Sequence, residues 1–210
     1  IRGHSNIQGM GTVGVTPKLK EKVFERLESE LGVTLPTFPG FDTLECLEAA
    51  DRGDMQFAFC LGGNLYGASP DASFSRRAIG RTDMTVYMST SLNTGHANGL
   101  AQEETIILPV LARDEEPEPS TQESMFSYVR LSDGGKPRHE QSADYGPRSE
   151  VKIISELGCR ILGTSGPVNW LEMSHTSTIR KAIGRMIPGL EQISKMDQTK
   201  EEFSIPGRTL

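Results

Sequence analysis

The spacing of apolar residues predicts helices in five parts of the chain. Residues three or four positions apart lie on one face of a helix, and apolar residues recur in this way over residues 17–31, 43–52, 71–80, 149–161 and 177–186. Asp42 stands where its side chain can cap the second of these helices. Gly32 and Gly53 stand where the first two would end.

Three short apolar runs predict strands, over residues 57–61, 84–88 and 105–109. The first run is continuously apolar, which is typical of a strand buried on both faces. Strands that alternate with helices predict parallel βαβ units with right-handed crossovers. We therefore predict a doubly wound α/β structure over residues 17–109. Ligands of such sheets bind at the carboxyl ends of the strands, here in the loops that begin at Gly62, Ser89 and Pro109.

Two stretches show neither pattern. Residues 1–16 are polar and rich in glycine, and we expect a loop that little apolar area holds in place. Residues 112–148 include the acidic run from Asp114 to Pro119 and a turn at Gly134-Gly135. We expect this second stretch to be a long loop with its acidic side chains in solvent.

The composition is that of a globular protein, with 210 residues of which 36% are hydrophobic and 24% charged. The net charge of −6 argues against a nucleic-acid partner, and no run approaches the length of about 20 apolar residues that spans a membrane. Cys46, Cys60 and Cys159 fit no zinc or iron–sulfur spacing and suggest a cytoplasmic protein. A start at Ile1 without a secretory signal favours a piece of a longer protein.

Glycine-rich segments offer two possible phosphate sites. Gly9 to Gly14 matches the G-x-G-x-x-G dinucleotide pattern, but no buried strand precedes it and the next helix begins too late. We predict that it is not a phosphate-binding turn. Gly62-Gly63-Asn64 directly follows a predicted strand, where backbone amides can bind an anion and the Asn64 amide can both donate and accept. A plain turn between strand and helix is the alternative.

Hydroxyl and imidazole groups follow the second predicted strand. Ser89 and Thr90 could bond a ribose or phosphate, or cap a helix. His96 lies in the next loop, and we include it among the candidate cofactor contacts, although a lone histidine is more often structural. The histidines share no spacing typical of a metal site, and no serine has a visible base and acid partner.

Five stretches, taken in order, resemble one family. Residues 2–9, Arg-Gly-His-Ser-Asn-Ile-Gln-Gly, resemble the R-G-x-x-N-[VI]-Q-G segment of molybdopterin oxidoreductases, in particular formate dehydrogenase alpha subunits. Leu61-Gly62-Gly63-Asn64, with Ser69-Pro70-Asp71 behind it, resembles that family's loop after a strand. Residues 105–109 and 149–157 resemble a V-[IV]-L-P strand end and a W-x-I-I-x-x-L helix, and residues 179–190 are similar to a formate dehydrogenase-like subgroup.

The resemblance implies a three-layer, doubly wound, mostly parallel α/β sheet, of the dinucleotide-binding type found in formate dehydrogenases and dimethyl sulfoxide reductases. It implies one guanine dinucleotide arm of bis(molybdopterin guanine dinucleotide), with molybdenum, or tungsten in some members. We expect a cofactor-proximal loop over residues 1–16, the binding domain over 17–165 and a helical appendage over 166–210. The metal ligand and the cysteines of a 4Fe-4S cluster would lie outside this chain, which would be inactive alone.

The resemblance also implies roles for single residues. Arg2 matches an arginine that orients the formate carboxylate, and Asn6, Gln8 and Gly9 would lie near the pterin. Contacts with the pyrophosphate and guanosine would come from Gly62, Gly63, Asn64, Ser69, Asp71, Ser89 and Thr90. The partners would be the other domains of the parent enzyme and a small substrate such as formate. Two alternatives stay open: a nicotinamide-dependent dehydrogenase that uses Gly9 to Gly14, and a non-catalytic α/β assembly module.

Overall fold

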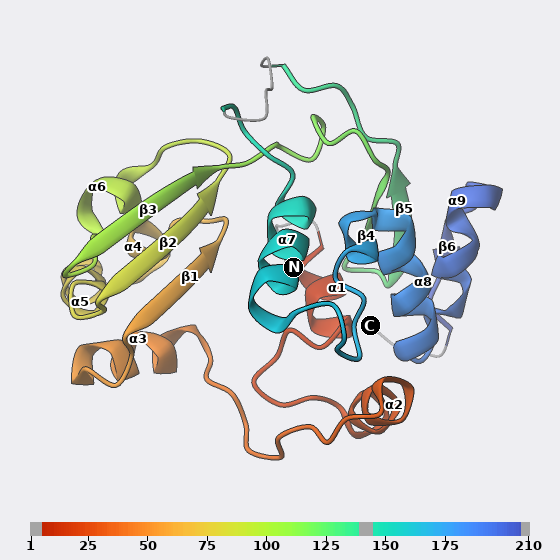
Figure 1. Cartoon of the computed structure of the whole chain (residues 1–210), viewed down its shortest axis with the longest axis horizontal. Coiled ribbons are helices and arrows are strands. Elements are labelled where there is room, and N and C mark those ends of the chain that lie inside the picture. The colour runs from red at the N-terminus through yellow and green to blue at the C-terminus, as the bar shows by residue number, and fades with distance from the viewer. Residues whose placement is uncertain (1–5, 139–144, 207–210) are drawn as a thin grey trace. The chain divides into compact units, whose positions relative to one another are not determined.

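A computed structural model describes residues 6–138 and 145–206, and the chain divides into two compact units (Figure 1). The parallel-sheet unit comprises residues 41–112 and 138–150. The antiparallel-sheet unit comprises residues 1–40, 113–137 and 151–210. This division differs from the boundaries expected at residues 16 and 165, which stay a prediction for the longer protein.

Three parallel strands form the parallel-sheet unit, in the order β1(Phe57–Leu61), β2(Met84–Ser89) and β3(Glu104–Pro109). Phe59 pairs with Val86, which in turn pairs with Ile106. Beyond β3, Val110 forms a parallel bridge with Arg148. The three predicted strands and their parallel arrangement are confirmed.

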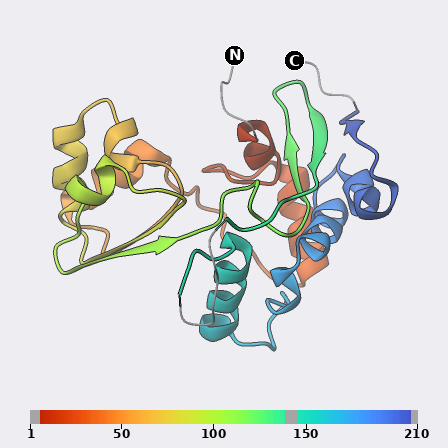
Figure 2. The same cartoon turned by 90° about the horizontal axis from the view of Figure 1, so that it is seen from above.

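The helices of this unit are α3(Thr43–Arg52), α4(Leu65–Ala68), α5(Ala72–Ile79) and α6(Thr94–Asn98). The predicted cap of α3 is confirmed, because the Asp42 carboxylate accepts from the backbone of Glu45 at 2.9 Å. The sheet adds its strands in one direction, from β1 to β2 to β3. Right-handed crossovers therefore place α5 and α6 on the same face of the sheet. Figure 2 shows these helices gathered on one side of the strands. A core of Leu47, Ala50, Ala78 and Ile79 joins α3 to α5.

The position of β1 corrects one expectation. Its apolar run predicted a strand buried on both faces, but β1 is an edge strand of the described sheet, and Phe57 and Leu61 are 54% and 57% exposed. A continuous apolar run does not show which strands lie beside it, and here a neighbour is present on one side. The structure is α/β with a parallel sheet, whereas the three-layer, doubly wound arrangement stays a prediction.

The antiparallel-sheet unit combines a small sheet with helices. Its strands are β4(Ser120–Glu123), β5(Tyr128–Ser132) and β6(Phe203–Ser204), in the order β4-β5-β6. Its helices are α1(Ile7–Thr12), α2(Glu21–Leu31), α7(Glu150–Leu162), η1(Glu172–Ser174), α8(Thr176–Met186), η2(Glu191–Lys195) and α9(Met196–Thr199). The core is apolar and consists of Val23, Val129, Met186, Ile187, Leu190, Ile193, Met196 and Ile205.

Two predicted loops are regular structure in this unit. Residues 120–132 form the β4–β5 hairpin inside the stretch expected to be a long loop. Residues 7–12 form α1 inside the expected loop over 1–16. Gly9 and Thr12 of α1 are buried, and contacts with β4 hold the helix in place. The expectation of a poorly anchored segment is therefore wrong for residues 7–12, because its anchors lie more than a hundred residues away in sequence.

Candidate functional site

The strongest candidate site lies at the carboxyl end of the parallel sheet. Gly62 and Gly63 follow β1 directly, and both have positive φ, at 69° and 72°. Glycine adopts this conformation at little cost. A Cβ added at either position would project into open space, with no atom within 4 Å. The Gly62 N–H donates to the Met88 carbonyl at 2.8 Å, which keeps the turn against β2. The loop thus leaves exposed backbone that a ligand can approach.

Two asparagines join this loop to the one that follows β2. The Asn64 amide nitrogen donates to the Thr94 hydroxyl at 2.9 Å, while its oxygen accepts from the Gly67 N–H at 2.8 Å and caps α4. In return, the Asn93 amide nitrogen donates to the Gly63 carbonyl at 3.1 Å. The ends of β1 and β2 are thereby fixed together, which holds the glycine loop in one shape.

His96 lies in α6, the helix that Asn93 caps. The ring is 8% exposed, and Nδ1 accepts from the Asn93 N–H at 3.1 Å. This bond places the ring proton on Nε2, which has no hydrogen-bond partner among the described residues. The ring stands at 69° to that of Tyr87, with 5.2 Å between centroids. Burial raises the pKa of Tyr87 to about 12, and the nearby Cys60 thiol adds to the shift.

The other predicted contacts of this unit differ in their surroundings. Ser89 is nearly buried, and its hydroxyl donates to the Ser91 carbonyl at 2.8 Å, whereas Thr90 is exposed. Asp71 caps α5 by accepting from the Phe74 N–H at 2.9 Å. Ser69 is half-buried where α4 ends. Asp71 thus has a clear structural role, and its ligand role stays a prediction.

Asn6, Gln8 and Gly9 belong to the antiparallel-sheet unit. Asn6 precedes α1 with a φ of 64°, and its side-chain oxygen accepts from the Glu123 N–H at 2.9 Å. A Cβ at Gly9 would lie 2.1 Å from that oxygen, so this position requires glycine. Gly9 and Gly11 lie inside a helix, which confirms that this segment is no turn between strand and helix. Arg2 lies outside the described residues.

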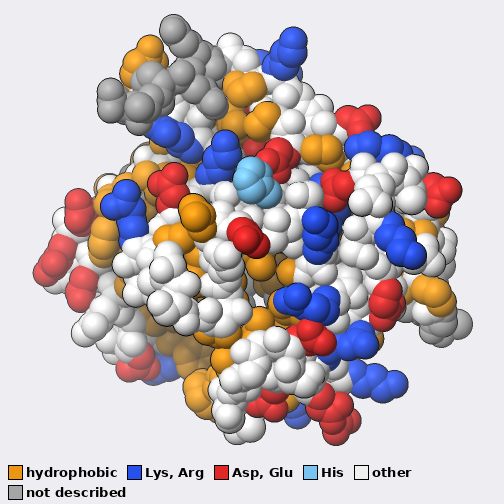
Figure 3. All heavy atoms as spheres, turned by 45° about the vertical axis from the view of Figure 1, so that its right-hand side comes forward, with side chains coloured by type: hydrophobic (Ala, Val, Ile, Leu, Met, Phe, Trp, Pro, Cys, Tyr) orange, Lys and Arg blue, Asp and Glu red, His pale blue; other side chains and the backbone are white. Residues whose placement is uncertain are grey.

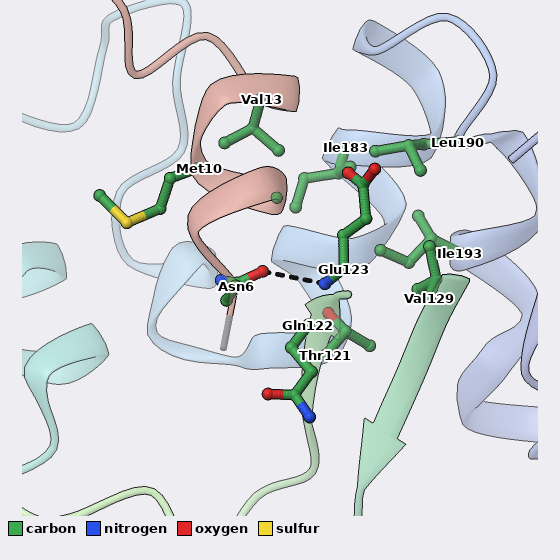
Figure 4. A pocket seen from close by; sticks show the side chains of 11 residues that line it. Asn6, Met10, Val13, Thr121, Gln122, Glu123, Val129, Ile183, Leu190 and Ile193 are labelled. Atoms are coloured by element: carbon green, nitrogen blue, oxygen red, sulfur yellow. Dashed lines mark hydrogen bonds between the residues drawn. The ribbon is translucent and has the colours of Figure 1, made fainter. Parts of the chain in front are cut away.

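A pocket of about 130 Å³ opens beside α1 in the same unit. Figure 4 shows Asn6 and Glu123 together with the apolar side chains of Val13, Ile183 and Leu190 around it. Glu123 is buried, and the Thr12 hydroxyl donates to its carboxylate at 2.5 Å. The sequence pattern predicted no role for Glu123 or Thr12. The acid in β4 and the hydroxyl in α1 are 111 positions apart, so no local pattern connects them.

Neither a cluster of metal-ligand side chains nor a membrane-spanning helix is present among the described residues. They contain no group of three or more His, Cys, Asp or Glu side chains that could hold a metal ion. Burial raises the pKa values of the Cys60 and Cys46 thiols, which disfavours the thiolate that binds metals. No described helix is long and apolar enough to cross a bilayer. On the face that Figure 3 shows, basic and acidic side chains are interspersed.

Sequence comparison places the chain within larger proteins. It is 34% identical over 212 aligned residues to an uncharacterized oxidoreductase of Mycobacterium tuberculosis, a match that covers 98% of this chain and 27% of the relative. The protein YdeP of Escherichia coli is 37% identical over 115 residues, which cover 55% of this chain and 15% of YdeP. A Staphylococcus haemolyticus protein, provisionally named a formate dehydrogenase, is 28% identical over 100 residues, which cover 44% of this chain and 10% of that protein.

The chain is homologous to one part of larger oxidoreductases. It spans about a quarter of the length of the mycobacterial relatives, 27% of each. No protein-family model matches the chain. The resemblance to formate dehydrogenases is the weaker one, at 28% identity over less than half of the chain.

Proposed function

We propose that the chain is the part of a larger oxidoreductase that binds one guanine dinucleotide arm of a molybdopterin cofactor. The observation that carries this proposal is the loop at Gly62 and Gly63, two positive-φ glycines with open space where a side chain would be. It lies at the carboxyl end of a parallel strand, where open α/β sheets bind their ligands. A pyrophosphate needs this kind of close backbone approach.

The donor set beside the loop fits a nucleotide. The amide groups of Asn64 and Asn93 each keep hydrogen-bonding capacity beyond the bonds that join the loops, because each side chain has two donors and two acceptor sites. The exposed Thr90 hydroxyl lies just after β2 and can reach a ribose or base. In this proposal the cofactor supplies two-electron chemistry when bound, while the residues of this chain bind and orient it.

In this proposal, catalysis requires parts of the longer protein that lie outside this chain. A small carboxylate such as formate would be the substrate, and Arg2 would offer it a planar guanidinium fork. The metal ligand and an iron–sulfur cluster would come from other parts of the polypeptide. The alternative of a nicotinamide site at Gly9 to Gly14 loses its structural basis, because that segment is largely helix α1.

The experiment compares two glycines in the full-length polypeptide. Gly53 matches Gly63 in positive φ, at 80°, and in open space around an added Cβ, but it ends α3. Gly63→Ala and Gly53→Ala should therefore cost similar strain, about 1 kcal/mol. We expect Gly63→Ala to lower the guanine nucleotide released by acid from the purified protein at least about tenfold. Gly53→Ala should leave this amount unchanged, and equal nucleotide content in both variants would contradict the proposal.

A further inference from the structure

His96 is joined to the glycine loop by two hydrogen bonds that pass through Asn93. The His96 Nδ1 atom accepts from the Asn93 N–H at 3.1 Å, and the Asn93 side-chain nitrogen donates to the Gly63 carbonyl at 3.1 Å. His96 belongs to α6, which follows β2, whereas Gly63 follows β1. The imidazole is therefore connected to the loop of the neighbouring strand, within the parallel-sheet unit.

The Asn93 side chain has only one orientation that satisfies its neighbours. Its oxygen accepts from the Gly95 N–H at 2.8 Å and caps α6. A flipped amide would place its nitrogen, which can only donate, against that N–H. Because the oxygen faces α6, the nitrogen faces Gly63. His96 completes the capping box by accepting from the backbone of the same asparagine, so both the backbone and the side chain of Asn93 are held.

The direction of the Gly63 carbonyl determines where the next amide points. The peptide bond between Gly63 and Asn64 is trans, so its C=O and N–H point in opposite directions. The carbonyl points to Asn93, and the Asn64 N–H is thereby directed away from Asn93. That N–H has no acceptor among the described residues. It is therefore left as a donor for an anion at this loop.

The His96 ring also carries a buried N–H without a partner. Nε2 holds the ring proton and makes no hydrogen bond to the described residues. A buried N–H without an acceptor destabilises a fold, and an apolar side chain of similar size would avoid this loss. Filling the space beside Tyr87 therefore does not account for a histidine at this position. The Nδ1 acceptor, which an apolar side chain lacks, does account for it.

We propose that His96 is a positioning residue that acts through Asn93 to set the direction of the peptide between Gly63 and Asn64. The Asn64 N–H is thereby presented to the pyrophosphate of a bound nucleotide, and this second step rests on the proposed function. The imidazole itself makes no contact with the ligand, because its Nε2 atom is buried. This role differs from the direct cofactor contact considered for His96 on sequence grounds.

Nitrogen-15 NMR relaxation of the 210-residue chain tests the first step without any ligand. His96→Leu removes the acceptor at similar volume, whereas His96→Gln supplies the type of acceptor that capping boxes usually have at this position. The order parameters of the Gly63 and Asn64 amides should be about 0.85 in the wild type and in His96→Gln, and below about 0.6 in His96→Leu. Equal values in the wild type and His96→Leu would overturn the proposal. A His96→Gln loop as loose as that of His96→Leu would overturn it too, because the acceptor would then not be the cause.

A double-variant cycle tests whether His96 acts through Asn93. Asn93→Asp keeps the acceptor for the Gly95 N–H but loses the donor to Gly63, so it should loosen the loop while α6 stays capped. Adding His96→Leu should loosen the loop no further, since both changes break the same connection. Additive losses would mean that His96 acts by another route, and the proposal would be wrong.

Tyr87→Phe is the matched control for damage to α6. It removes a buried hydrogen bond at the other end of the helix, from the Tyr87 hydroxyl to the Gly99 carbonyl, and leaves Asn93 untouched. The Gly63 and Asn64 amides should stay as rigid as in the wild type. If Tyr87→Phe loosened them as much as His96→Leu does, any disturbance of α6 would have this effect and no positioning role would remain.

The guanine nucleotide content of the full-length polypeptide tests the second step. His96→Leu should lower it at least about threefold, because a loop that is not held in its binding shape binds more weakly, and His96→Gln should restore it. If Gly63→Ala lost nucleotide but His96→Leu did not, the positioning proposal would be wrong while the proposed function stood. If neither variant lost nucleotide, the proposed function would fail, and the NMR measurements alone would decide whether His96 shapes the loop.

Discussion

The two units stabilise their buried polar groups in opposite ways. In the antiparallel-sheet unit, Arg180 is 2% exposed and is held by charge: its guanidinium donates to the Asp197 carboxylate at 2.9 Å and to the Pro119 carbonyl at 2.7 Å. In the parallel-sheet unit the buried groups are neutral. Thr82 and Thr85 share a hydrogen bond of 2.9 Å, and Tyr87 donates to the Gly99 carbonyl at 2.5 Å. One unit depends on an ionised carboxylate and the other on a protonated phenol.

The two units should therefore lose stability at opposite ends of the pH scale. The hydrogen bond from Arg180 lowers the pKa of Asp197. Burial opposes ionisation of Glu118, but hydrogen bonds from His175 and Thr176 outweigh it and lower its pKa as well. A lowered carboxyl pKa gives stability that is present above the unfolded value, about 4, and is lost as the pH falls through the folded value. The pKa of Tyr87 is raised instead, so the stability that this group contributes is lost as the pH rises.

The largest expected effect follows from removing the buried cation. Arg180→Met would leave Asp197 without its partner and the Pro119 carbonyl without a donor. Removing one partner of a buried ion pair costs about 3–5 kcal/mol, and the lower end applies because a quarter of the Asp197 side chain is exposed. Denaturant unfolding followed by the fluorescence of Trp170, the single tryptophan, would measure this loss in the unit that contains it.

Arg185 on the same helix provides the control for this substitution. It pairs with Glu30 at 2.9 Å, but the Arg185 side chain is 58% exposed. Exposed pairs contribute about 0–1 kcal/mol. Arg185→Met should therefore have a small effect, and similar losses in the two variants would show that the buried network does not stabilise the unit.

The second-largest expected effect is the loss of stability of the parallel-sheet unit at alkaline pH. The pKa of Tyr87 rises from 10.0 to about 12, so the folded unit keeps the phenolic proton that the unfolded chain releases. Stability from this group is complete below pH 10, declines as the pH rises towards about 12, and amounts to about 2–3 kcal/mol. Urea midpoints followed by circular dichroism from pH 8 to 12 would measure it. Tyr87→Phe should flatten this profile, and an unchanged slope would exclude Tyr87 as its source.

The contact between α1 and β4 gives a third, smaller effect. Thr12→Val keeps the shape of the side chain but removes the donor to the buried Glu123 carboxylate. A hydrogen bond to a charged group contributes about 1.5–3 kcal/mol. The same substitution at the exposed Thr16 should change little. The loss would be measured by Trp170 fluorescence, and an equal response at both threonines would mean that α1 is not anchored through Glu123.

The same contrast explains what the sequence could predict. In the parallel-sheet unit the signals are local: an apolar run makes each strand, and Asp42 and Asp71 cap the helices that follow them. The glycine loop after β1 was therefore found at its true position. In the antiparallel-sheet unit the decisive contacts span the chain, as between Thr12 and Glu123, and no periodicity predicts them. For the same reason, the sequence could not show that β1 is an edge strand.

The smallest effect concerns the link between the two loops of the candidate site. Asn64 makes two bonds: its oxygen caps α4 at Gly67, and its nitrogen donates to Thr94. Asn64→Ala removes both and should cost about 1 kcal/mol, the usual value of a helix cap. Asn64→Asp keeps the acceptor but loses the donor, so it should retain the cap and break the link. Hydrogen exchange of residues 65–68, in α4, and of residues 94–98, in α6, distinguishes the two variants. The alanine variant should exchange faster in both segments and the aspartate variant faster in the second alone. Faster exchange in α4 alone for both variants would show that the loops are held together by Asn93 rather than by Asn64.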